Sequence, residues 1–211
     1  MPNSGLLYFG VVHLMTFIRE PIQRYISEYE HVKRGATWPK AVRTCKNLDL
    51  YKESCLKKGI RIDISMQEFL KCDVNLGNNR QVRMLADYNV IGCTALKCWT
   101  KSANCSQKMK EFNEQKVLHS AKHTLLGLAF FGLTEYQTLS EFLFVKTFGD
   151  NKFKLSEPII EKKDTQASIS MKGEAGKYID RIKSNNHLDI QLYEFAKEIF
   201  FKRVAYFKNE K

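Results

Sequence analysis

The stretch at residues 16–38, TFIREPIQRYISEYEHVKRGATW, most constrains what this chain can fold into. It begins with the end of an apolar, partly β-branched run at residues 8–18, which predicts a buried β-strand. Pro21 suits the first turn of a helix, and apolar residues then recur at helical spacing as far as residue 34. Gly35 is typical of a helix stop. The sequence therefore predicts a strand, a sharp turn and a helix.

The turn between this strand and this helix has the composition of an anion site. Arg19 offers a planar guanidinium that can bind phosphate with two hydrogen bonds, and a helix N-terminus offers free N–H donors. The residues Arg24, Ser27, Glu28 and His31 are expected on the polar face of the helix, opposite the apolar one. An ordinary ion pair made by Arg19 is the alternative interpretation.

The rest of the chain predicts a layered α/β fold. Helices are expected at 66–72, 78–87, 107–126, 134–148, 174–186 and 188–207, and a second buried strand at 128–133. Capping boxes are expected at 65–68 and 134–137. The order helix, strand, helix over 107–148 predicts a parallel sheet. We expect one domain, 1–211, with cysteine-bearing loop excursions at 40–64 and 94–106.

The net charge of +11 indicates a polyanionic partner. Nucleic acid, an anionic membrane surface and a sulfated or carboxylated glycan all satisfy that charge, and a solvated basic surface is the plain alternative. Arg80 and Arg83 stand three residues apart on one expected helix. They could bind a polyanion together, or they could belong to a solvated face. A single-strand nucleic-acid binder should interleave aromatic and basic residues. Only Trp38 approaches that pattern, so we expect no nucleic-acid partner.

The cysteines and the start of the chain indicate conflicting compartments. The chain has six cysteines, which are Cys45, Cys55, Cys72, Cys93, Cys98 and Cys105, and Asn104 begins a glycosylation sequon. Disulfides in an oxidising lumen, free buried thiols and a metal site are the three interpretations; without a Cys-x-x-Cys pair near a histidine, we expect no metal. The start shows no signal peptide and no run long enough to span a membrane. We therefore expect a luminal chain that is truncated at its front.

Four stretches resemble the heparan-sulfate 6-O-sulfotransferase family. The run IREPIQRYISEYEHVKRGATW is similar to that family's second nucleotide-binding motif. The stretches NNRQVRMLAD at 78–87, FFGLTE at 130–135 and LDIQLYEFAK at 188–197 match in the same order. The resemblance covers nearly the whole chain.

The resemblance implies a reaction and the residues that bind its reactants. These enzymes transfer a sulfuryl group from 3′-phosphoadenylyl sulfate to the 6-hydroxyl of glucosamine in heparan sulfate. Arg19 and Ser27 match the residues that hold the 3′-phosphate of the donor. His31 and Trp38 match positions that contact the acceptor.

The resemblance also implies a loop with further donor contacts, at 160–166. The matching positions are Ile160, Glu161, Lys162, Thr165 and Gln166. The match is loose, because Glu161 and Lys162 stand where the family has Gln-Tyr and Gln166 replaces an arginine.

The implied fold is a P-loop-like sulfotransferase sheet flanked by helices, here without its N-terminal strand and 5′-phosphosulfate loop. That loop and the histidine that serves as general base are expected upstream of Met1, so we expect this chain alone to be inactive. The whole protein would be a Golgi enzyme that is anchored in the membrane by a segment outside this chain. A non-catalytic protein that binds heparan sulfate or another polyanion is the rival interpretation.

Overall fold

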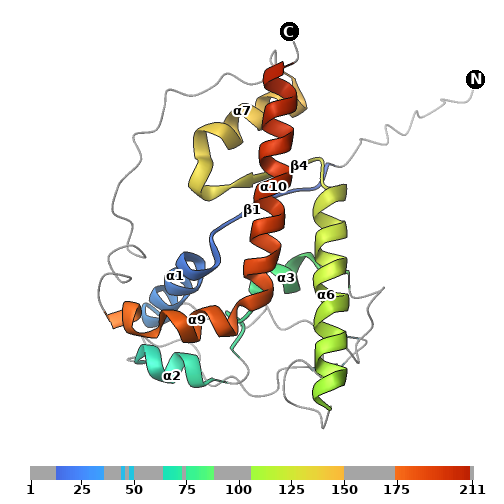
Figure 1. Cartoon of the computed structure of the whole chain (residues 1–211). Helices are drawn as coiled ribbons and strands as arrows, with labels where there is room; N and C mark the ends of the chain where they lie inside the picture. The colour runs from blue at the N-terminus through green and yellow to red at the C-terminus, as the bar shows by residue number, and fades with distance from the viewer. Residues whose placement is uncertain are drawn as a thin grey trace, which may run out of the picture.

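The computed structural model of the chain describes residues 13–35, 44–45, 48–49, 64–72, 75–87, 106–149 and 174–209, with the backbone alone at 44–45 and 48–49. Its elements are, in order, β1 (Met15–Ile18), α1 (Pro21–Lys33), β2 (Thr44–Cys45), β3 (Leu48–Asp49), α2 (Met66–Lys71), α3 (Arg80–Leu85), α6 (Gln107–Gly127), β4 (Phe130–Leu133), the 3₁₀ helix η1 (Thr134–Tyr136), α7 (Gln137–Phe148), the 3₁₀ helix η2 (Glu174–Tyr178), α9 (Ile179–Asn185) and α10 (His187–Asn209). The long helices α6 and α10 stand side by side (Figure 1).

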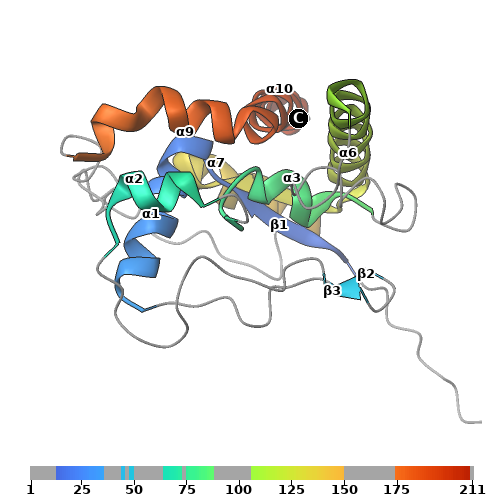
Figure 2. The same ribbon diagram turned by 90° about the horizontal axis from the view of Figure 1, so that it is seen from below.

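β1 and β4 pair in parallel, which confirms the predicted parallel arrangement at these two strands. The register places Met15 opposite Phe130 and Ile18 opposite Leu133. Seen from below, α6, α9 and α10 lie on one side of β1 (Figure 2). The carboxyl end of β1 runs directly into the turn before α1.

The predicted burial is confirmed for β4 and is wrong for the described part of the first strand. All four residues of β4 are buried, whereas Leu14, Met15 and Phe17 are exposed and Ile18 is the buried residue of β1. Among the described residues β1 is paired along one edge only, to β4, so one neighbour shields it. Residues 8–12 lie outside the described residues.

Helix α1 matches the prediction at both ends. Glu20 is its N-cap and Pro21 its first residue. Gly35, with φ 88°, follows the C-cap in the left-handed conformation that favours glycine. The predicted apolar face is buried through Tyr25, Ile26, Tyr29 and Val32.

The capping box at Ser65 and Glu68 is confirmed, and the one predicted at 134–137 is wrong. Ser65 accepts from the backbone of Glu68, whose carboxylate accepts from the backbone of Ser65 at 2.9 Å. After β4 the chain instead forms η1, and the hydroxyl of Ser140 bonds both backbone groups of Leu133. Within the predicted 40–64 excursion, β2 and β3 form a short antiparallel ladder.

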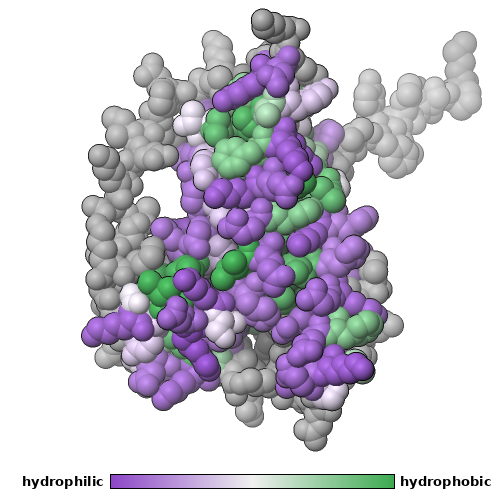
Figure 3. Space-filling view, in the orientation of Figure 1, coloured by the Kyte–Doolittle hydropathy of each residue, from purple (hydrophilic) through white to green (hydrophobic). Residues whose placement is uncertain are grey.

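Two apolar clusters form the core. The larger one joins α3, α6, β4, α7 and α10 and includes Leu125, Phe131 and Phe200. The smaller one joins α1, α2 and α9 around Tyr25 and Phe69. In the view of Figure 3 the described surface is mostly hydrophilic, with apolar patches over α7 and the adjoining part of α10.

Candidate functional site

The turn between β1 and α1 is held by two side chains from distant parts of the chain. The Gln81 side chain bonds both backbone groups of Arg19: Oε1 accepts from Arg19 N at 2.8 Å, and Nε2 donates to Arg19 O at 2.9 Å. Glu135 Oε1 accepts from the backbone N–H of Glu20 at 2.8 Å. Because both residues of the turn are tied down, the backbone from which the Arg19 side chain departs is fixed.

The first amides of α1 are occupied, so the expectation of free N–H donors there is wrong. The Glu20 carboxylate accepts from Ile22 N at 3.1 Å and from Gln23 N at 2.8 Å. An N-cap carboxylate satisfies these donors and complements the helix dipole. An anion at this turn must therefore be bound by side chains.

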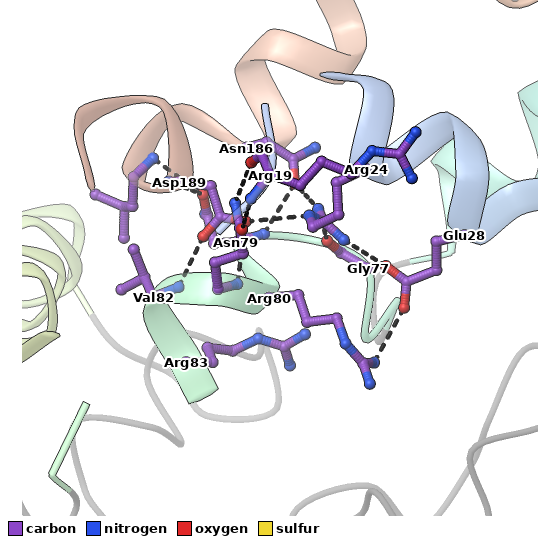
Figure 4. A network of polar contacts seen from close by, with 12 residues as sticks. Arg19, Arg24, Glu28, Gly77, Asn79, Arg80, Val82, Arg83, Asn186 and Asp189 are labelled. Carbon is purple, nitrogen blue, oxygen red and sulfur yellow. Dashed lines mark hydrogen bonds and ion pairs between the residues drawn. The ribbon is translucent and has the colours of Figure 1, made fainter. Parts of the chain in front are cut away.

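Arg19 and Ser27 both have side chains without a polar partner among the described residues. Both are partly buried. Figure 4 shows Arg19 next to the polar network described below. Within the described residues, neither the Arg19 guanidinium nor the Ser27 hydroxyl has a hydrogen-bond or ion-pair partner. The alternative that Arg19 makes an ordinary ion pair finds no support among those residues.

The polar side of α1 is shielded from solvent at Arg24 and Glu28. Arg24 donates to Gly77 O at 2.6 Å, to Asn186 Oδ1 at 2.7 Å and to the Glu28 carboxylate (Figure 4). The side chains of Arg24 and Glu28 are only 11% and 9% exposed. The reason is that Gly77 and Arg80, before and at the start of α3, and Asn186 and Asp189, before and at the start of α10, bring polar groups to these two side chains.

Asn79 and Asp189 complete the network. Asn79 Oδ1 accepts from the backbone of Leu188 at 2.9 Å, and Asp189 Oδ1 accepts from Val82 N at 2.8 Å. Asn186, fully buried, accepts from Asn79 N as well as from Arg24. The network thereby joins α1, α3 and α10.

Asp189 is fully buried, and burial raises its pKa. Arg24 and the amides of Val82 and Gln81 act in the opposite direction, because they favour the charged carboxylate. The Arg24 Nε to Asp189 Oδ2 separation is 3.5 Å. Removing Arg24 would leave Asp189 buried without this counter-charge, whereas removing Asp189 would leave Arg24 paired with Glu28 alone.

Arg80 and Arg83 are internal contacts, neither a solvated pair nor a free grip for a polyanion. Arg80 Nη1 lies 3.0 Å from Glu28 Oε1. Arg83 donates to the carbonyl of Leu76. Both guanidinium groups therefore help to hold α3 in place.

The predicted site residues divide into those that the structure describes and those that it does not. His31 is exposed on α1, and its Nδ1 lies 3.2 Å from Arg34 Nη2. Trp38 and the donor-loop residues Ile160, Glu161, Lys162, Thr165 and Gln166 lie outside the described residues, as do Asn104, Cys55, Cys93, Cys98 and Cys105. The structure thus brings Arg19, Ser27 and His31 onto one strand–turn–helix unit.

Sequence reasoning missed the residues that support this unit. Gln81, Asn79, Glu135 and Asp189 all lie inside the stretches that carry the family resemblance. Their location in these stretches is the signal by which the sequence could have pointed to them. The local sequence alone gives no reason to pair a glutamine with a turn that precedes it by 62 residues.

The described residues hold neither a metal-ligand cluster nor a helix that could span a membrane. They contain no group of three or more His, Cys, Asp or Glu side chains that could hold a metal ion. None of their helices combines the length and the apolar character that crossing a bilayer requires.

A comparison with known families finds one that matches most of the chain. The model of the family described as "Sulfotransferase family" matches residues 8–196, which is most of the chain. The chain belongs to the sulfotransferase family. The match contains β1, α1 and all the residues of the polar network.

Curated heparan-sulfate 6-O-sulfotransferases are similar to this chain over most of its length. Heparan-sulfate 6-O-sulfotransferase 2 of Gallus gallus is 37% identical over 201 residues, which is 94% of this chain and 46% of that protein. Heparan-sulfate 6-O-sulfotransferase 1 of Homo sapiens is 38% identical over 197 residues, 92% of this chain and 44% of that protein. Heparan-sulfate 6-O-sulfotransferase 3 of Homo sapiens is 37% identical over 199 residues, 93% and 39% respectively. This sulfotransferase chain therefore spans less than half the length of these curated relatives.

Proposed function

We propose that this chain is part of a heparan-sulfate 6-O-sulfotransferase. The reaction transfers a sulfuryl group from 3′-phosphoadenylyl sulfate to the 6-hydroxyl of glucosamine in heparan sulfate. The names of the similar proteins support the substrate, and family membership supports the sulfuryl donor. One observation carries the site: a partly buried guanidinium without a partner among the described residues, on a turn whose backbone is fixed.

Arg19 and Ser27 are proposed to bind the 3′-phosphate of the donor. A guanidinium fork matches two phosphate oxygens, and charge-assisted hydrogen bonds of this kind are the strong ones. The Ser27 hydroxyl can donate a further hydrogen bond. Because the Glu20 carboxylate occupies the first amides of α1, these two side chains would carry this part of the binding.

His31 and Trp38 are proposed to contact the acceptor. An imidazole can donate to a sulfate or carboxylate of the glycan, and an indole presents a flat face to a sugar ring. The exposure of His31 on the same helix as Ser27 supports this assignment. The net charge of +11 suits a polyanionic acceptor.

Further donor contacts are proposed in the loop at 160–166. The positions are Ile160, Glu161, Lys162, Thr165 and Gln166, and they are assigned by resemblance alone. Lys162, with a cation, and Thr165, with a hydroxyl, have the side chains best suited to bind a phosphate.

The wider setting is also a proposal. We infer a single sulfotransferase domain over 1–211 with a P-loop-like sheet, to which the parallel pair β1 and β4 would belong. A Golgi lumen, a membrane anchor elsewhere in the protein and glycosylation at Asn104 follow from the resemblance. Disulfides are supported by Cys72, which is disulfide-bonded and buried.

Binding of the two reactants, measured separately, tests this function. Calorimetry with the desulfated donor product, 3′-phosphoadenosine 5′-phosphate, and with 6-O-desulfated heparan should detect both ligands. Heparan binding without binding of the donor product would contradict the proposal and favour a non-catalytic polyanion-binding protein. For the protein that contains this chain, product mapping should find new sulfate at the 6-hydroxyl and at no other position.

A further inference from the structure

We propose that Gln81 is a positioning residue for the donor phosphate and acts through Arg19. This inference rests on the proposed function, since it assumes that Arg19 binds the 3′-phosphate. Gln81 would not touch the donor. It would fix the backbone from which the Arg19 guanidinium reaches the phosphate.

The geometry of the Gln81 side chain resembles the pairing of one strand with another. Its amide accepts from Arg19 N at 2.8 Å and donates to Arg19 O at 2.9 Å. Among side chains, only asparagine and glutamine amides present a donor and an acceptor of this kind together. The side chain thus supplies to the residue after β1 the two hydrogen bonds that a neighbouring strand would supply.

Gln81 is itself held rigidly. Its backbone N–H donates to Asp189 Oδ2 at 3.1 Å, and Asp189 is fully buried. The side chain therefore links Arg19 to the buried network that joins α3 and α10. A fixed anchor on one side of the turn limits the directions that the Arg19 side chain can take.

The other side of the turn is anchored independently. Glu135 accepts from Glu20 N at 2.8 Å and from the Tyr193 hydroxyl at 3.1 Å. Loss of Gln81 should therefore loosen Arg19 without releasing Glu20 or unfolding α1. This makes a defect in donor binding separable from a defect in folding.

The test uses Gln81→Met, which keeps the length of the side chain and removes both hydrogen bonds. Affinity for 3′-phosphoadenosine 5′-phosphate should fall about tenfold, as expected for imperfect placement of a charged contact. Affinity for adenosine 5′-phosphate, which lacks the 3′-phosphate, should not change. Gln67→Met is the matched control, because Gln67 occupies the same second position of α2 and is exposed.

A double-mutant cycle separates positioning from a purely structural role. In an Arg19→Ala background, Gln81→Met should cause no further loss of affinity, because its effect passes through the missing guanidinium. An equal loss for both nucleotides, or a full additional loss in the Arg19→Ala background, would overturn the inference. So would unchanged affinity in Gln81→Met.

Three further outcomes are distinguished. If Gln81→Met does not fold, Gln81→Glu serves instead, since it keeps an acceptor for Arg19 N and removes the donor to Arg19 O; the same selective loss is expected. If the unaltered chain does not bind 3′-phosphoadenosine 5′-phosphate at all, the proposed function itself fails. If the unaltered chain binds and the Gln81 variants bind equally well, only the role of Gln81 fails.

Discussion

Asn79 and Asp189 cap each other's helices. Asn79 Oδ1 accepts from the backbone N–H groups of Leu188 and Asp189 at 2.9 and 3.2 Å, at the start of α10. Asp189 accepts from two backbone N–H groups at the start of α3, those of Gln81 and Val82, at 3.1 and 2.8 Å. Asn79 reaches its position with φ 46° and ψ 41°, a left-handed conformation that asparagine adopts more readily than most residues. Two helix ends that are distant in sequence are thereby locked together.

Asp189→Ala should strongly destabilise the fold. It removes the acceptor of the Gln81 and Val82 N–H groups and one of the two buried carboxylates beside Arg24, a loss of about 3–5 kcal/mol in the free energy of unfolding. Urea unfolding measures the effect. Asp180→Ala is the control, because Asp180 is exposed on α9, and it should change stability by less than about 0.5 kcal/mol. Similar small effects for both variants would show that the reciprocal caps contribute little.

Gly77→Ala and Gly127→Ala should have effects of opposite sign. A Cβ on Gly77 would lie 2.9 Å from Asn75 Oδ1 and 3.2 Å from Tyr25 Cε2, and both side chains are buried. We expect a loss of about 1–3 kcal/mol from this overpacking. A Cβ on Gly127, at the end of α6, meets nothing within 4 Å, so alanine there should gain about 0.4–1 kcal/mol. Thermal unfolding of both variants compares them directly, and a stabilising Gly77→Ala would contradict the packing described around Tyr25.

Stability should depend on pH through His187. The hydrogen bond to Glu114, with Nε2 and Oε2 3.2 Å apart, raises the pKa of His187 above its ordinary value, while partial burial acts in the opposite direction. The folded state therefore holds this proton more tightly than the unfolded chain, in which the histidine has its ordinary pKa of about 6.5. The contribution should be complete below about pH 6.5 and should be lost as the pH rises through the higher pKa of the folded state.

Glu114→Gln should flatten this pH dependence, because it removes the charge that stabilises the imidazolium. Urea unfolding at a series of pH values from about 6 to 8 gives the slope. Glu111→Gln is the control on the same helix, and it should keep the slope of the unaltered protein. Equal slopes in all three proteins would assign the pH dependence to other groups.

Most of the helices and the two strands β1 and β4 could be predicted from the sequence because their signals are local. The apolar spacing along α1 and α6, Pro21 at a helix start and Ser65 with Glu68 at a cap each act within a few residues. The polar network could not be predicted in this way. Whether Arg24 is solvated or buried depends on Asn186 and Asp189, which lie more than 160 residues away, and no local pattern encodes that approach.

In the candidate site, too, some features could be predicted from the sequence and others could not. Arg19, Ser27 and His31 could be singled out because they lie on one predicted strand, turn and helix and match positions of the family motif. The closure of the α1 N-terminus by Glu20, and the hold of Gln81 and Glu135 on the turn, appear only in three dimensions. Because of these contacts, the proposed anion site would have to rely on side chains.

Arg19 is proposed to recognise the 3′-phosphate of the sulfuryl donor. Calorimetry should compare 3′-phosphoadenosine 5′-phosphate with adenosine 5′-phosphate, which differ only in that phosphate. We expect the unaltered chain to prefer the first by about tenfold or more, because a charge-assisted contact contributes about 1.5–3 kcal/mol. Arg19→Ala should abolish the preference, and Arg181→Ala, which removes an exposed cation on α9, should retain it. Equal affinity of the unaltered chain for both nucleotides, or a preference that survives Arg19→Ala, would contradict the account.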